Sequence, residues 1–198
     1  MRRPRVVRAA ARRTGAALLT VAAAWLLGVA LAQPGYYPSE AGMSWTYANG
    51  ETQTLSGPRE VLGASRMVLT HYFGGVPVSE EILAFGAGVE SHGTAAGGEV
   101  MAYTPPLTVY PPDPLQPGDT WQSTTTVGGV DITLSSEVLG LSGVRTPAGR
   151  FNALRIRQTT LTSSGGRTVL ELFFVPTVGV VRFVTQDGTQ IDLIERTF

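Results

Sequence analysis

Hydrophobic and polar residues alternate along most of the chain after residue 32. In residues 66–73, for example, Met67, Leu69 and Phe73 share one parity with His71, and residues 130–135 and 154–157 repeat the pattern. A period of two places successive side chains on opposite faces of an extended strand. Val, Thr, Tyr and Phe, which suit a pleated surface, are frequent in these runs. The pattern therefore predicts strands and not helices.

Short turn signals separate these runs. Paired glycines, Asn-Gly and Asp-Gly supply the positive φ angles that tight hairpins need. Their spacing predicts an antiparallel meander of roughly ten strands. The one helix candidate is residues 79–85, which fit a strand or loop equally well. The expected fold is mostly all-β, a single curved antiparallel sheet of half-barrel or barrel-like form, with little helix outside the N-terminal leader. The signals are Asn49-Gly50, Gly74-Gly75, Gly97-Gly98, Gly128-Gly129, Gly165-Gly166 and Asp187-Gly188.

A proline-rich segment divides the chain after the leader. Six prolines fall within residues 104–118, and proline cannot donate a hydrogen bond to a strand ladder. We expect this segment to be an extended connection that joins two halves and packs on the sheet. Each half opens on a Gly turn followed by a Trp, Gly42 with Trp45 and Gly118 with Trp121. The echo indicates either two similar strand entries or an ancient duplication.

The N-terminus has the three regions of a secretory signal peptide. Residues 1–15 carry six arginines and no acidic residue, residues 16–31 are almost entirely apolar, and Ala30-Leu31-Ala32 places small residues before Gln33. We expect residues 1–32 to be a cleaved signal peptide, with an uncleaved membrane anchor as the alternative. Residues 33–198 are then a single β domain exported to the periplasm, the cell envelope or the exterior.

Composition narrows the function classes. The chain has no cysteine, so neither a lipidated N-terminal cysteine nor a disulfide is expected. After residue 32, nine arginines face fifteen acidic residues. This acidic balance argues against binding to nucleic acid and against docking on anionic lipid. We therefore expect contact with a membrane only through the transient signal peptide.

Candidate catalytic chemistry is sparse. His71 lies on an otherwise apolar strand face, which favours a hydrogen-bonded, semi-buried structural role, and His92 lies beside Gly93 in an expected turn. No acidic cluster accompanies either histidine at a ligand spacing, so we predict no metal or cofactor. Glu80 and Glu81 are adjacent and should point to opposite faces of a strand. The sequence predicts no catalytic residue and no enzyme, although a hydrolase with a dispersed site stays open as a third hypothesis.

The last strands are apolar on both faces. Residues 169–175 and 180–184 carry apolar side chains at both parities. The second face needs a cover, which a second sheet, the proline-rich connection, a partner subunit or an apolar ligand could supply. Packing of the chain on itself is the favoured reading. An apolar pocket in a curved sheet would suit a lipid or acyl chain.

Two function hypotheses follow from this composition and pattern. The first is a non-catalytic exported β domain that binds an apolar ligand or an apolar segment of another protein. The alternative is a structural or assembly module of the cell envelope that uses an edge strand or the two-sided apolar strands as its interface. The oligomeric state is open in both.

Several short motifs extend this picture. They are Tyr36-Tyr37-Pro38 with residues 42–47, then residues 115–121, 146–151, 173–176 and 178–181. Together they resemble a group of uncharacterised bacterial secreted proteins and lipoproteins related in fold to the lipoprotein-localisation-factor (LolA-like) superfamily. The resemblance implies a strongly curved antiparallel sheet, often a half-barrel, that can have an apolar concave face, and it carries over no catalytic residue. The chain departs from the lipoprotein members of that group because it lacks the cysteine that would be lipidated.

Overall fold

The computed structural model describes residues 35–86, 88–112 and 114–198, and the predicted signal peptide, residues 1–32, lies outside them. The described residues form twelve strands and no helix. The strands are β1 (Ser44–Tyr47), β2 (Glu51–Val61), β3 (Ala64–Phe73), β4 (Val76–Phe85), β5 (Val89–Ala96), β6 (Glu99–Tyr110), β7 (Thr120–Val127), β8 (Val130–Thr146), β9 (Gly149–Thr162), β10 (Arg167–Val175), β11 (Gly179–Thr185) and β12 (Gln190–Thr197).

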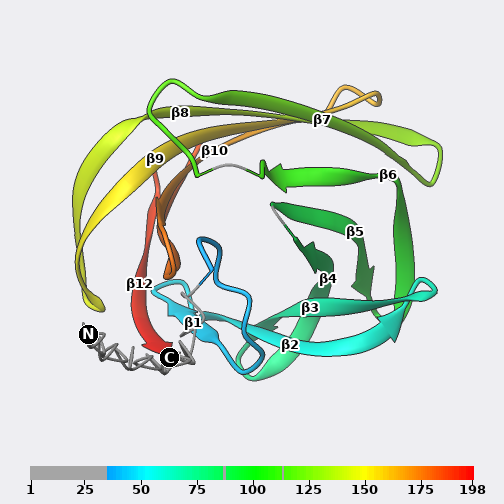
Figure 1. The fold of residues 1–198 in the computed structure, drawn as a ribbon, viewed down its shortest axis with the longest axis horizontal. Coiled ribbons are helices and arrows are strands. Elements are labelled where there is room, and N and C mark those ends of the chain that lie inside the picture. Colours follow the sequence, from blue (N-terminus) through cyan, green and yellow to red (C-terminus); the bar gives the residue numbers. More distant parts are fainter. Residues whose placement is uncertain (1–34, 87, 113) are drawn as a thin grey trace, which may run out of the picture. The chain divides into compact units, whose positions relative to one another are not determined.

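Each strand pairs antiparallel with the next one in the chain, and β12 pairs back onto β1, so the sheet closes into a barrel (Figure 1). The prediction of a single curved, barrel-like antiparallel sheet is confirmed. The strand count was too low, twelve against roughly ten. Residues 79–85, the helix candidate, belong to β4.

The predicted hairpin turns occur where the paired glycines stand. Gly74 and Gly75 join β3 to β4 with φ angles of 57° and 79°. Two consecutive positive φ angles give a turn whose twist matches that of the flanking strands, and glycine adopts them without steric cost. The same pair type at Gly128-Gly129 joins β7 to β8.

The proline-rich segment differs from its prediction. Strand β6 runs through Pro105 and Pro106 to Tyr110, so nearly half of the expected connection is strand. The two prolines are tolerated because few backbone N–H groups of this part of β6 would donate to a neighbouring strand. Strand β6 pairs with β7 at one position only, and its pairing with β5 is interrupted at the prolines. Side chains close this junction instead. The indole Nε1 of Trp121 donates to the carbonyl of Val109 at 3.1 Å.

The two halves of the barrel begin with the same turn. Gly42 and Gly118 both have a φ of 93°. Each donates its N–H at 2.8 Å to the second strand of its half, Gly42 to the carbonyl of Leu55 and Gly118 to that of Val138. Three residues later a tryptophan enters the first strand of each half. The backbone geometry therefore confirms that the chain enters the first strand of each half in the same way.

Beyond the turns, two rows of paired residues correspond between β1–β6 and β7–β12, although the bulges in the β3–β4 and β5–β6 pairings have no counterpart in the second half. A β-bulge interrupts the pairing of the fourth and fifth strands at the same place in both halves, at Ile82/Leu83 and at Phe173/Phe174. The two halves are thus one six-stranded architecture used twice, and duplication as its origin stays a prediction. The row Trp45–Gln53–His71 corresponds to Trp121–Ser136–Gln158, and the row Leu55–Leu69–Glu81–Thr94–Met101 corresponds to Val138–Ile156–Leu172–Phe183–Ile191.

The long β8–β9 hairpin covers the outer side of the last strands. It curves past β12 (Figure 1), and its end donates and accepts hydrogen bonds there. Arg182 donates from Nη2 to the carbonyl of Arg145 at 3.1 Å, and the N–H of Ala148 donates to the carbonyl of Leu193 at 3.3 Å. Phe173, on the outer face of β10, is accordingly 9% exposed. The favoured expectation of self-packing therefore holds for this face.

Candidate binding cavity

The inner face of the barrel is not completely filled. It lines a cavity of about 460 Å³ that is open to the outside. Pockets for small molecules commonly span about 300–1,000 Å³ and are mostly apolar. Both halves of the barrel contribute to the wall, which includes Leu55, Leu69, Leu170, Leu172, Phe174 and Phe183. Alternation along each strand aims these side chains inward, so the pattern that forms the sheet also forms the cavity.

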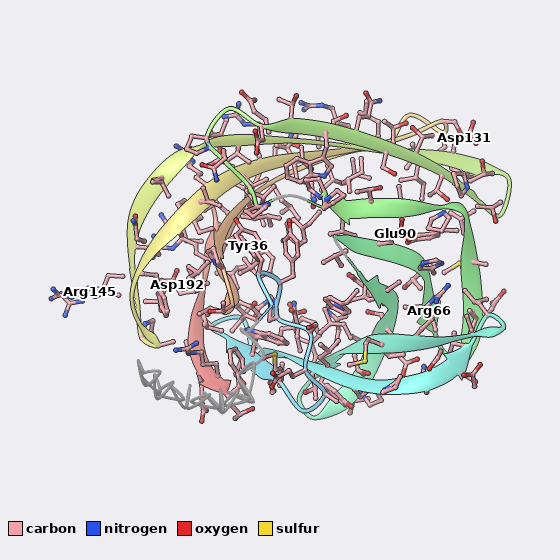
Figure 2. The ribbon with its side chains drawn as sticks, in the orientation of Figure 1. Tyr36, Arg66, Glu90, Asp131, Arg145 and Asp192 are labelled. Atoms are coloured by element: carbon pink, nitrogen blue, oxygen red, sulfur yellow. The ribbon has the colours of Figure 1, made fainter. Side chains whose placement is uncertain are left out.

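Aromatic rings pack along one part of the cavity. Tyr110 stacks on Tyr37 with ring centroids 5.1 Å apart, and Phe174 lies 5.1 Å from Tyr110 and 5.8 Å from Tyr36. Figure 2 shows Tyr36 inside the ring of strands. The hydroxyl of Tyr37 donates to the carbonyl of Pro111 at 2.9 Å. Burial raises the pKa of the Tyr110 hydroxyl, which therefore stays neutral. This segment of the wall is closely packed and uncharged.

A charged cluster stands in the opposite part of the wall. His71 on β3 lies between two carboxylates from the strands beside it: Nδ1 is 2.7 Å from Glu51 Oε1 on β2, and Nε2 is 3.5 Å from Glu81 Oε1 on β4. Gln53 donates to the same oxygen of Glu51 at 2.9 Å. The side chains of Glu51 and His71 are 16% and 17% exposed, whereas that of Glu81 is 44% exposed. All four residues line the cavity. We call Glu51, His71 and Glu81 the charged trio.

The protonation state of the trio follows from its contacts. Burial lowers the pKa of His71, but the hydrogen bonds to Glu51 and Glu81 outweigh burial and raise this pKa to about 9. The hydrogen bond from His71 is also the main cause that lowers the pKa of Glu51. At neutral pH, His71 is therefore an imidazolium between two carboxylates, and the trio carries a net charge of −1.

In the second half of the barrel, uncharged side chains occupy the positions that correspond to the charged trio. Leu134, Gln158 and Leu172 occupy the positions that correspond to Glu51, His71 and Glu81. These side chains satisfy the same registers without forming an ion pair. The trio is therefore not required by the architecture, and a charged cluster in a cavity is a candidate binding site.

Sequence reasoning missed the trio. The hydrogen-bonded, semi-buried state of His71 is as predicted. The prediction concerned acidic residues at a ligand spacing in the sequence, and it did not foresee that the fold brings two carboxylates beside His71. Glu51 and Glu81 are remote in sequence and are brought beside His71 by cross-strand pairing, which no residue spacing reveals. One signal was available: His71 occupies an otherwise apolar parity of its strand. Glu80 and Glu81 do point to opposite faces, since Glu80 pairs with Arg59 on the outer face.

His92 lies elsewhere. It is part of β5, at a bulge, and not in the expected turn. A bulge adds an unpaired residue to a strand, and beside Gly93 this position has the sequence signature of a turn. Its Nδ1 is 3.5 Å from Arg66 Nη2, and its Nε2 is 3.3 Å from Glu90 Oε2 (Figure 2). Burial, and then the charge of Arg66, lower the pKa of His92. It does not line the cavity.

Two further properties concern the described residues as a whole. Over 35–86, 88–112 and 114–198, no group of three His, Asp or Glu side chains has the arrangement to hold a metal ion. In the same ranges, no helix reaches the length and hydropathy that crossing a membrane requires.

Comparisons with known proteins give distant similarity only. No family model matches the chain, and no curated protein matches it. A solved structure of a candidate lipoprotein from Parabacteroides distasonis is 13% identical, with 83% of this chain and 99% of that chain covered and a TM-score of 0.47. A candidate exported protein with a YmcC-like fold from Bacteroides fragilis is 13% identical, with 84% and 100% covered and a TM-score of 0.46. The resemblance to the LolA-like superfamily stays a prediction.

Proposed function

We propose that this is an exported, non-catalytic binding protein that holds an apolar small molecule, such as a lipid or an acyl chain, inside the barrel. The observation that carries the proposal is the cavity of about 460 Å³ with a wall of Leu and Phe side chains from both halves. Transfer of apolar surface from water to such a wall is favourable by about 25 cal/mol per Å². Export rests on the predicted signal peptide, residues 1–32.

Hydrolysis is a weaker reading of the same cavity. A general base must be unprotonated at the working pH and must reach the proton it removes. Both ring nitrogens of His71 are engaged with carboxylates, and a pKa of about 9 keeps the ring protonated at neutral pH. The trio is thus better suited to hold a ligand group than to activate water.

A second candidate is the assembly module. Phe73, Val76 and Val78 at the β3–β4 hairpin are 43%, 60% and 45% exposed. Clustered exposed apolar side chains are a feature of interaction surfaces. This candidate predicts a dimer or larger species by light scattering after size exclusion, and replacing Val76 and Val78 with Thr should return it to a monomer.

Binding of an apolar dye tests the first proposal. N-phenyl-naphthylamine is neutral and fluoresces strongly in apolar surroundings. We expect saturable fluorescence with the purified protein. The variant Leu170→Trp places a larger side chain in the cavity wall and should weaken dye binding at least about tenfold, a difference of about 1.4 kcal/mol in binding free energy.

The matched control is Leu141→Trp. Leu141 is 62% exposed and does not line the cavity, so this variant receives the same new side chain outside the site and should bind the dye normally. Circular dichroism of both variants checks that the sheet has formed. Absence of saturable dye binding, or equal binding by both tryptophan variants, would contradict the proposal. Mass spectrometry of an organic extract of the purified protein would then identify any lipid that co-purifies.

A further inference from the structure

The charges that face the cavity have one sign in excess. Glu51 and Glu81 face it with His71 between them, and none of the residues that line it is an arginine. The chain contains no lysine at all. A carboxylate or phosphate group of a ligand would therefore meet two carboxylates and one imidazolium already paired with both of them. Like charges in a partly desolvated cavity repel strongly, which disfavours an anionic ligand.

Glu81 is the member of the trio that remains open to a ligand. Glu51 accepts from His71 at 2.7 Å and from Gln53 at 2.9 Å, and its side chain is 16% exposed. Glu81 lies 3.5 Å from His71 Nε2, a long contact, and its side chain is 44% exposed. A carboxylate has about four acceptor positions, so Glu81 can accept from an incoming donor without losing His71.

The two walls of the cavity differ in the charge that they present to a ligand. Strands β2, β3 and β4 supply every charged side chain of the wall together with Leu and Phe side chains, whereas β10 and β11 supply Leu, Val and Phe side chains and no charged one. In the second half of the barrel, Leu172 occupies the position that corresponds to Glu81. A ligand that spans both walls therefore needs one polar end and one apolar body.

We propose that the ligand is a cationic amphiphile whose primary ammonium head is held by Glu81, with its apolar body against β10 and β11. This inference rests on the proposed function and adds the chemical class of the head group. An ammonium donates hydrogen bonds and supplies the positive charge that neutralises the trio. Fatty acids carry a carboxylate, so we expect them to bind poorly.

Three ligands with the same chain and different heads test the proposal. Decylamine, decanol and decanoate are titrated at neutral pH against protein that carries the bound dye. An alkyl ammonium keeps its proton at this pH, as lysine does with a pKa of about 10.4. We expect decylamine to displace the dye about tenfold more tightly than decanol, and decanoate to be the weakest of the three.

Two adjacent variants separate the site from the net charge of the protein. Glu81→Gln should reduce the affinity for decylamine to about that for decanol, and it should change decanol binding much less than decylamine binding. Glu80→Gln removes the same charge one residue away, on the outer face where Glu80 pairs with Arg59, and should leave all three affinities unchanged. Circular dichroism of each variant checks that the sheet has formed.

The outcomes are distinguishable. Equal displacement by decylamine and decanol, tighter binding of decanoate, or an equal loss in both variants would overturn the head-group assignment while the proposed apolar binding stands. Failure of all three ligands to displace the dye would remove the proposed function and the inference together. The comparison of the three ligands on the unmodified protein decides the point even without the variants.

Discussion

The two six-stranded halves of the barrel, β1–β6 and β7–β12, share their entry turns, two rows of paired residues and one β-bulge, but present different chemistry to the cavity. The first half places Glu51, His71 and Glu81 on the inner face. The second half places Leu134, Gln158 and Leu172 at the corresponding positions. One half thus serves as a comparison for the other, because corresponding positions share a pairing register while the side chains differ, although a bulge beside His71 has no counterpart at Gln158.

This comparison separates what the fold needs from what it merely tolerates. The second half forms a barrel wall with leucine at two of the three corresponding positions. A charged side chain at these positions is therefore not required for the strands to pair. Charges withdrawn from water lose solvation and are costly unless they are paired. The trio compensates by pairing internally through His71. A charged cluster that the fold could replace with leucine is best explained by what it binds.

The outer face reverses the distribution. On β9 and β10 of the second half, Arg155 and Arg157 both bond the carboxylate of Glu171, with distances of 2.6 Å and 3.2 Å. Two arginines around one glutamate outside the barrel contrast with two glutamates around one histidine inside it. The outer cluster joins two strands and the trio joins three, and the arginines of the outer cluster are more exposed than His71 and Glu51.

The largest effect should come from the apolar wall. Phe174 is 1% exposed and contacts the rings of Tyr36, Tyr37 and Tyr110. Truncation of a buried phenylalanine typically costs about 3–5 kcal/mol of unfolding free energy, and we expect Phe174→Ala to fall in this range. Urea denaturation followed by tryptophan fluorescence measures it. Leu83→Ala, at the corresponding position of the first half, should cost less, about 2–4 kcal/mol. A smaller loss for Phe174→Ala than for Leu83→Ala would contradict the expectation that the buried aromatic side chain contributes more to stability.

The trio should produce the next largest effect, as a pH dependence. The pKa of His71 is raised to about 9 in the folded protein and is about 6.5 when unfolded. A raised pKa contributes stability that is full below pH 6.5 and is lost as the pH rises through 9. We expect a loss of about 1–3 kcal/mol between these values. Denaturant unfolding at a series of pH values measures it.

The control for this prediction is His71→Gln, which installs the residue that the second half uses at the corresponding position. The variant should be less stable near pH 6 and should lose most of the change between pH 6.5 and 9. Few other groups titrate in this window, because the chain has two histidines and no cysteine, and the pKa of His92 is lowered out of it. An unaltered pH profile in the variant would show that His71 is not the group that titrates.

Much of the fold could be read from the sequence because its signals are local. Alternation over 66–73 and the glycine pair Gly74-Gly75 act within a hairpin, so the pattern alone predicts them. Strand β6 was missed because proline there removes ladder donors, which normally excludes a strand. It is tolerated where the neighbouring pairing is absent, and that condition depends on β5 and β7, not on β6 itself.

The site could not be read in the same way. Glu51, His71 and Glu81 meet because of the register of three neighbouring strands, and a shift of one residue in either pairing would turn a carboxylate to the outside. Periodicity predicts that a strand exists but not which residue faces which. The correspondence between Trp45 and Trp121 was visible in the sequence, but only the registers extend it to the positions that distinguish the two halves.

The smallest effect should come from the outer cluster. Arg155 and Arg157 are 44% and 47% exposed, so water screens their attraction to Glu171 and competes for the same hydrogen bonds. We expect Glu171→Gln to change the unfolding free energy by no more than about 1 kcal/mol, and by less at high salt. Urea denaturation at low and high ionic strength measures both. A loss of unfolding free energy as large as that of His71→Gln would mean that the outer cluster stabilises the protein as much as the charged trio does. The two clusters would then differ only in the sign of their net charge. Exposure to solvent would no longer explain why only the charged trio is a candidate site.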